Sequence, residues 1–215
     1  MPFSFTDFHF WPIPTRLGEM QLLLPAALIA IWRMHREVDA RPLAAWWLLA
    51  LAVATLITTA TKVAFIGWGV GSAWLNFAGI SGHAMFAGAI FPVLMGAFAS
   101  HAKPWLQRIA IAAGFGLAAL VGLSRAMVDA HSVSEIVAGL LFGGVASLSL
   151  TLLHRLPRAV MGPRLAVVVV AAWLLVGMLG APESPTHSLV TRLALSIAGK
   201  AEPYTREDLL KEYRH

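Results

Sequence analysis

The stretch PLAAWWLLALAVATLITTAT, from Pro42 to Thr61, runs for 20 residues without a charged side chain. Four further uncharged windows follow it, at 84–100, 109–124, 136–153 and 165–182. A helix that crosses a bilayer needs about 20 mostly apolar residues, within a range of roughly 17–25. A weaker window at 20–32 reaches this length if Arg33 extends its charged end to the interface. The sequence therefore predicts six membrane-spanning helices, at about 17–34, 43–66, 82–100, 105–123, 132–153 and 164–181.

The composition of the whole chain agrees with a membrane protein. Of its 215 residues, 58% are hydrophobic and 13% are charged, and the mean hydropathy is +0.73. A soluble domain carries about 25% charged residues, so the soluble, fibrous and disordered classes are excluded. The cysteine count of 0 excludes disulfides, thiolate catalysis and thiolate metal sites. The chain has a net charge of +5. Its basic residues lie mostly between the hydrophobic spans, which indicates membrane topology and argues against nucleic-acid binding.

The basic residues show which side of the membrane each loop faces. Half of the 16 Lys and Arg residues lie in or beside the loops 35–42, 101–108 and 154–164. By the positive-inside rule these loops are cytoplasmic, and both termini and the loops 67–81 and 124–131 lie outside. We expect an all-α, multi-pass protein of the cytoplasmic (inner) membrane. Residues 1–182 would form a bundle of about six transmembrane helices, and residues 183–215 an amphipathic C-terminal tail.

Polar and ionisable residues gather at the outer ends of these predicted helices. Ionisable residues at membrane depth are costly and often functional. Taken singly, Lys62 can be a snorkelling lysine, His83 an interfacial histidine, and Ser132 with Glu135 a capping box. Together, however, two histidines, two cations and two helix N-termini are all directed to one side of the membrane. The candidate site residues are Lys62, Ser81, Gly82, His83, Ser124, Arg125, His131 and Glu135.

This combination of residue types suits phosphoryl transfer. Helix N-termini bind phosphate, Arg125 can hold it bidentately, and Lys62 supplies a point charge. His131 and Glu135 are four residues apart and share a helix face, so the carboxylate can orient one ring nitrogen and leave the other to attack. His83, on another helix, can protonate the departing oxygen. The sequence shows no carboxylate cluster for magnesium or zinc, and it predicts cofactor-free chemistry through a phosphohistidine.

The segment SRAMVDAHSVSE, from Ser124 to Glu135, resembles the SRxxxxxHxxxD motif of the type 2 phosphatidic acid phosphatases. That family shares its site with the vanadium haloperoxidases and the bacterial acid phosphatases. The tripeptide at 81–83 matches the end of the family's PSGH motif, and Lys62 matches the start of KxxxxxxRP. The resemblance implies that His131 is the nucleophile, Glu135 its orienting acid and His83 the general acid. It implies a phosphate cradle made of Lys62, Ser81, Gly82, Ser124 and Arg125.

Three positions depart from the family pattern. Gly69-Val70 stands where the family has Arg-Pro, Glu135 replaces the usual Asp, and Ile80 replaces the proline before SGH. A phosphate would then meet two cations instead of three, unless a cation of the tail folds back to the site. The candidates for that accessory cation are Arg192, Lys200 and Arg206. Within the tail, Thr205 and Asp208 have the spacing of a helix N-cap and its acid.

We expect a membrane phosphatase that hydrolyses a phosphate monoester or diphosphate on a lipid, with its active site on the outer face. Phosphatidate, phosphatidylglycerophosphate, a prenyl diphosphate such as the undecaprenyl carrier, and a lipid A phosphate all fit this expectation. Two alternatives stay open: a phosphotransferase that passes the phosphate to another lipid, and a catalytically inactive relative that binds lipids or acts as a scaffold. The sequence indicates no oligomeric state.

Overall fold

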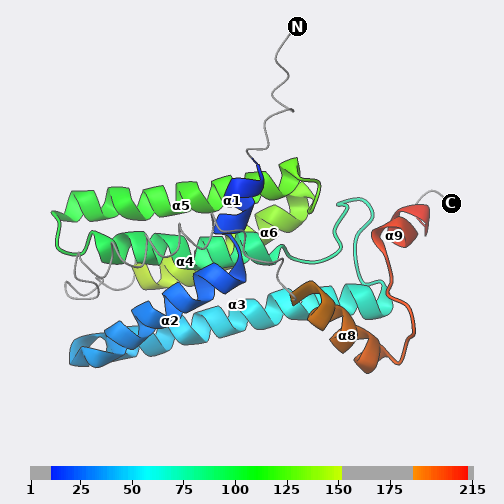
Figure 1. Cartoon of the computed structure of the whole chain (residues 1–215), viewed down its shortest axis with the longest axis horizontal. Coiled ribbons are helices and arrows are strands. Elements are labelled where there is room, and N and C mark those ends of the chain that lie inside the picture. The colour runs from blue at the N-terminus through cyan, green and yellow to red at the C-terminus, as the bar shows by residue number, and fades with distance from the viewer. Residues whose placement is uncertain (1–10, 152–185, 213–215) are drawn as a thin grey trace, which may run out of the picture.

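The computed structural model describes residues 11–151 and 186–212, and the regular elements of this part are helices (Figure 1). They are α1 (Pro12–Leu17), α2 (Met20–Arg36), the 3-10 turn η1 (Val38–Ala40), α3 (Arg41–Trp68), α4 (Gly82–Phe98), α5 (Pro104–Met127), α6 (Val133–Thr151), α8 (Thr186–Ala198) and α9 (Arg206–Glu212).

Five of the six predicted helices correspond to α2 through α6, and the sixth, at 164–181, lies outside the described residues. Three described segments are long and apolar enough to cross a membrane, namely 38–68, α5 and α6. The first helix differs from the prediction of one continuous span from residue 17. The chain breaks at Gly18 and Glu19, where Glu19 has an extended backbone (φ −62°, ψ 130°) and precedes α2 as its N-cap. This break separates α1 from α2.

Helix α4 forms the centre of the bundle. It has 17 residues, of which 13 are buried, and it packs against both α5 and α6. The α4–α6 contact is close because Gly139 and Gly143 have no side chain. A Cβ at either position would collide with a backbone carbonyl, that of Ser81 or of Met85. Small residues of this kind allow transmembrane helices to approach closely.

The helices alternate in direction, so their ends form two opposite groups. The C-terminal ends of α3 and α5 meet the N-terminal ends of α4 and α6 at one end of the bundle (Figure 1). The short helices α8 and α9 lie at that same end. The described basic residues of the predicted cytoplasmic loops lie at the opposite end of the bundle; they are Arg33, Arg36, Arg41, Lys103 and Arg108.

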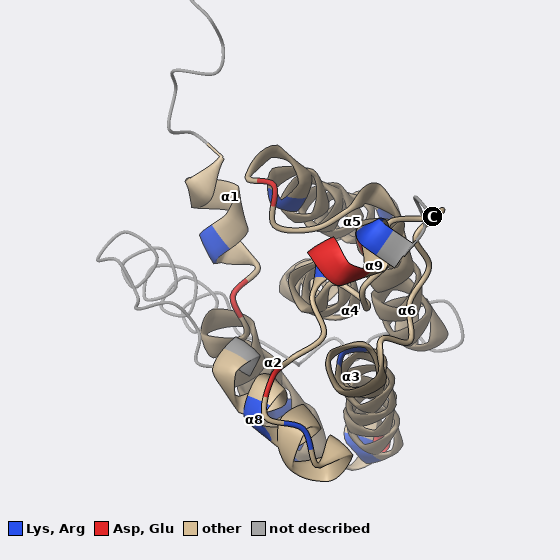
Figure 2. Cartoon of the chain, turned by 90° about the vertical axis from the view of Figure 1, so that its right-hand side faces the viewer, with Lys and Arg blue, Asp and Glu red and all other residues tan. Residues whose placement is uncertain are grey.

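The C-terminal tail docks on the end of α3 through a small apolar cluster. Val190 and Ala194 of α8 and Leu209 of α9 are buried against Phe65 and Ile66 of α3. The predicted N-cap of α9 is confirmed, because the Thr205 hydroxyl donates to Asp208 Oδ2 at 2.6 Å and accepts from the Asp208 amide at 3.3 Å. Seen from this end, α9 lies in front of the bundle (Figure 2).

Candidate active site

A cavity of about 900 Å³ lies at this end of the bundle, between the tail and the ends of α2 to α6. Six of the eight predicted site residues line it. These residues are Lys62, Gly82, His83, Arg125, His131 and Glu135. Of the three tail cations, Arg206 lines the cavity, whereas Arg192 and Lys200 are exposed and do not.

The two predicted serines are buried and do not belong to the cavity lining. Ser124 makes local contacts, since its hydroxyl donates to the Val121 carbonyl at 2.7 Å and accepts from Thr15 at 2.9 Å. The Ser81 hydroxyl has no hydrogen-bond partner among the described residues. Its backbone precedes α4 as the N-cap, and its amide donates to the Glu135 carbonyl at 3.1 Å.

His131 and Glu135 form a close pair. Nδ1 of His131 lies 2.7 Å from Oε2 of Glu135, and the two side chains are 15% and 1% exposed. An Nδ1–H that donates to this carboxylate leaves Nε2 as the nitrogen available to a substrate. The same carboxylate accepts from the Ser132 amide at 3.1 Å, so the capping box is present as well. One side chain thus begins the helix and orients the histidine.

The turn that carries His131 is fastened to Arg125. The amides of Ala130 and His131 donate to the Arg125 carbonyl at 3.0 and 3.3 Å. Asp129 has a positive φ of 52°, which reverses the chain between α5 and α6. The backbone therefore brings the arginine and the histidine of this motif to the same wall of the cavity.

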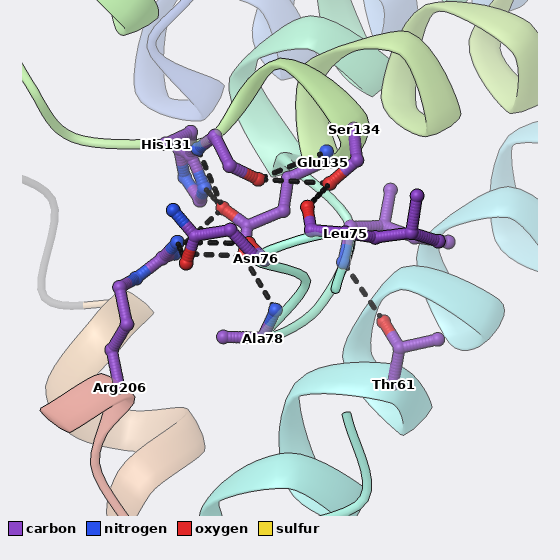
Figure 3. Close-up of polar contacts among 10 residues, drawn as sticks. Thr61, Leu75, Asn76, Ala78, His131, Ser134, Glu135 and Arg206 are labelled. Carbon is purple, nitrogen blue, oxygen red and sulfur yellow. Dashed lines mark hydrogen bonds and ion pairs between the residues drawn. The ribbon is translucent and has the colours of Figure 1, made fainter. Parts of the chain in front are cut away.

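Glu135 receives two further groups from distant parts of the chain (Figure 3). The Ala78 amide donates to Oε1 at 2.6 Å. The guanidinium of Arg206 donates from one nitrogen to both carboxylate oxygens, at 2.7 and 2.9 Å. Its other terminal nitrogen donates to the backbone and side-chain oxygens of Asn76, at 2.9 and 2.8 Å. The buried carboxylate is therefore fully occupied by donors.

The cationic side of the cavity carries donors that are not used within the described part of the protein. Arg125 Nε is buried and has no hydrogen-bond partner there. The amine of Lys62 lies near the N-terminus of α4, only 3.8 Å from the position that a Cβ on Gly82 would take. A buried donor such as Arg125 Nε is normally satisfied, and both Arg125 and Lys62 line the cavity.

His83 lies beside a carboxylate that the sequence analysis did not include. Its Nε2 is 4.0 Å from Oε1 of Glu19, beyond a direct hydrogen bond, and the two side chains are 23% and 13% exposed. Glu19 lines the cavity because the chain breaks between α1 and α2. In the sequence, a glycine followed by an acidic residue just before an apolar run could have pointed to Glu19. Asn76, which the sequence analysis also did not include, had no such sequence signal.

Two site residues outside the membrane-spanning segments, His131 and Glu19, have pKa values below their ordinary ones. Burial lowers the pKa of His131, and Lys62 adds to this, whereas the hydrogen bond to Glu135 opposes it. His131 is therefore neutral at pH 7, as a nucleophile requires. The His83 ring lowers the pKa of Glu19 most strongly, burial opposes this, and Arg125 and Arg16 contribute further lowering. Glu19 is therefore ionised beside His83.

The position of the missing Arg-Pro is covered by the tail. Gly69 ends α3 in the left-handed conformation, with φ 72°. A Cβ there would meet the ring of Tyr204 at 3.1 Å and would be strained by this backbone conformation. The Tyr204 amide donates to the Ile66 carbonyl at 2.9 Å, and its ring packs edge-on against Phe65. An arginine side chain at position 69 would therefore compete with the tail for space.

Comparison with known proteins assigns the chain to a family. A family model described as the PAP2 superfamily matches residues 20–159. An uncharacterized 22.5 kDa protein in the cps region of Klebsiella pneumoniae is 31% identical over 205 residues, covering 94% of this chain and 98% of that protein. No solved structure shows significant similarity to the chain.

Proposed function

Because the chain belongs to the PAP2 superfamily, whose members are typically phosphatases, we propose that it hydrolyses a phosphate monoester or diphosphate carried on a lipid. One observation carries this proposal. The oriented pair of His131 and Glu135 shares a single cavity with His83, Lys62 and Arg125, which are the groups that phosphoryl transfer through a histidine requires.

The phosphate would lie between the N-terminus of α4 and the cations. Its oxygens would accept from the Gly82 amide, the Lys62 amine and the Arg125 guanidinium. Arg125 Nε, which has no partner in the described ranges, would then be satisfied. Leaving such buried groups unpaired costs about 1–3 kcal/mol each. An anionic ligand therefore gains affinity from groups that are already desolvated.

Two displacements would complete the reaction. First, Nε2 of His131 attacks phosphorus, and the bond from phosphorus to the lipid oxygen breaks while His83 donates a proton to that oxygen. Water then attacks the phosphohistidine, His83 accepts a proton from the water, and the phosphorus–nitrogen bond breaks to release phosphate. Glu135 keeps the proton on Nδ1 and stabilises the positive charge that forms on the ring.

An apolar groove supports a lipid as the substrate. A cavity of about 430 Å³ lies between α2 and α3, and its lining includes Leu28, Leu48 and Leu56. Phe86 of α4 lines both this groove and the larger cavity. A hydrocarbon chain in the groove would place its phosphate end on the polar side of Phe86. A water-soluble phosphate ester would make no use of this groove.

The proposed orientation follows from the distribution of charge along the bundle. The two described basic loops, 35–42 and 101–108, lie at the end opposite to the cavity, and such loops are retained in the cytoplasm. The cavity would then face the outer side of the cytoplasmic membrane. A substrate such as phosphatidate or the undecaprenyl diphosphate carrier would reach it by lateral diffusion in that leaflet.

Phosphate release by the purified full-length protein in detergent tests this function. We expect turnover of lipid phosphates or diphosphates in the presence of EDTA, and its loss in His131→Ala. Activity that persists in His131→Ala, or that needs an added divalent metal, would contradict the mechanism. Phosphate recovered on an acceptor lipid would instead identify a phosphotransferase. Binding of the lipid phosphates and diphosphates without turnover of any of them would identify an inactive lipid-binding relative.

A further inference from the structure

We propose that the C-terminal tail completes the active site, with Arg206 as a positioning residue that holds Glu135 and, through it, His131. This inference rests on the proposed function for its kinetic consequences, but the contact itself is independent of the substrate. It also differs from the expectation that a tail cation replaces the missing arginine as a phosphate ligand.

The contact is an ion pair in which one guanidinium nitrogen donates to both oxygens of a buried carboxylate. One terminal nitrogen of Arg206 lies 2.7 and 2.9 Å from the two oxygens of Glu135, whose side chain is 1% exposed. The other terminal nitrogen is held by two oxygens of Asn76 at 2.9 and 2.8 Å. Charge-assisted bonds of this geometry are stronger than neutral ones and define orientation. Arg206 therefore holds the same carboxylate that His131 contacts.

The tail that carries Arg206 is itself fastened to the bundle. Tyr204 donates its amide to Ile66 at the end of α3, and its ring covers Gly69. Leu209 is buried in the apolar cluster with Phe65. The segment between them places Arg206 at the first residue of α9, and its side chain extends from there to Glu135 (Figure 3). The lack of a side chain at position 69 thus leaves the space in which the tail docks.

The partners of Arg206 distinguish a positioning role from phosphate binding. Both terminal nitrogens already donate to Glu135 and Asn76, whereas the Arg125 Nε in the same cavity is unpaired among the described residues. Removing Arg206 would leave a buried carboxylate with less compensation, and the His131–Glu135 pair could then shift together out of the attacking orientation. This change alters the chemical step, so kcat should fall while KM stays nearly constant.

Loss of Arg206 should also change the pH profile. The charged groups that face His131 are Glu135 on α6, Lys62 on α3, Arg125 on α5 and, through Glu135, Arg206 of the tail. Without Arg206 the net charge around the ring becomes more negative, which favours the imidazolium form. The acid limb of kcat/KM should therefore move to higher pH. A purely structural role would leave this limb unchanged.

The test compares Arg206→Ala and Arg206→Lys with Lys211→Ala in the full chain. Lys211 is an exposed cation of the same helix and pairs only weakly with Glu207, at 3.9 Å, so its variant serves as the matched control. We expect Arg206→Ala to lower kcat about 10- to 100-fold, since a displacement of about 1 Å can cost that much. Arg206→Lys should be intermediate, because an ammonium can replace the nitrogen that meets Glu135 but not the second nitrogen that Asn76 holds.

Added guanidinium should restore part of the kcat of Arg206→Ala at millimolar concentration and should not restore His131→Ala. A rise in KM with unchanged kcat would assign Arg206 to phosphate binding and overturn the inference. Wild-type kcat and an unmoved acid limb in Arg206→Ala would also overturn it. If Arg206→Ala does not fold, the Arg206→Lys comparison decides between the same outcomes.

A titration of the His131 ring by 15N NMR separates this inference from the proposed function. If the wild-type protein has no phosphatase activity but Arg206→Ala raises the titration midpoint of His131, the function fails and the positioning role stands. If the wild-type protein is active and the midpoint does not move, the positioning role fails and the function stands.

Discussion

Replacing Glu135 by Gln is expected to stop turnover, because every group around this side chain is a donor. The two carboxylate oxygens together accept five hydrogen bonds, two of them from one nitrogen of Arg206. The remaining donors are Ala78, His131 and Ser132. An amide of the same shape has one oxygen and one NH2 group, so in either orientation its NH2 faces donors.

The size of the loss in kcat depends on which donors the NH2 group of the amide faces. If its NH2 faces His131, the ring must accept on Nδ1 and carry its proton on Nε2, which blocks the attacking nitrogen. A carboxylate-to-amide change of this kind beside a catalytic histidine lowers kcat by about 10⁴. If the NH2 instead takes the place of Oε1, it faces the Ala78 amide and Arg206. A charged donor then loses an acceptor, and hydrogen bonds to charged groups contribute about 1.5–3 kcal/mol each.

The assay is phosphate release at saturating lipid phosphate, with thermal unfolding followed by circular dichroism as the measure of folding. Glu135→Asp is the matched control, because it keeps the charge but withdraws the carboxylate by about one bond length of ~1.5 Å. We expect the order wild type, then Glu135→Asp at about 100-fold lower kcat, then Glu135→Gln. The reasoning is refuted if Glu135→Gln retains more than a tenth of the wild-type kcat.

Three further outcomes follow from the structure. Burial lowers the pKa of His131 below the ordinary 6.5, so the acid limb of wild-type kcat/KM should lie below pH 6.5. Because the pKa of His131 is higher in the unfolded chain, the unfolded chain takes up a proton first as the pH drops. The melting temperature should therefore fall below pH 6.5, and a melting temperature that stays constant down to pH 5 contradicts this. Glu19→Gln should reduce hydrolysis of alkyl phosphates more than that of aryl phosphates with good leaving groups, because Glu19 favours the protonated form of His83; equal losses count against it. Gly139→Ala should destabilise the protein by about 1–3 kcal/mol, because a Cβ there meets the backbone before α4. Gly116→Ala, with open space around it, should melt like the wild type.

The helices could be predicted because the relevant signal is local. Each of α2 to α6 overlaps an uncharged window over most of its length, and bilayer thickness limits where such windows can end. The residues of the third motif could likewise be placed together, because Arg125, His131 and Glu135 lie on one helix end, one short turn and the next helix start. Their mutual position depends on only 11 residues of chain.

The contacts of Glu19 and Arg206 depend on packing between distant segments. The break before α2 appears only when α1 crosses toward α5, where Gly18 lies against Val121. Arg206 approaches Glu135 across 71 residues of sequence, through a tail that docks on apolar side chains of α3. Composition could mark the tail as amphipathic and Arg206 as a cation, but neither indicates which carboxylate the cation meets.

The position of Arg206 near the C-terminus has a consequence for how activity arises during synthesis. Ribosomes make the chain from its N-terminus, so α2 to α6 are complete, and Glu135 and His131 already paired, well before residue 206 emerges. If the tail is needed to hold the carboxylate, the nascent protein stays catalytically silent until its last two short helices have settled onto α3. A premature stop between α8 and Arg206 would then yield a well-inserted but idle bundle.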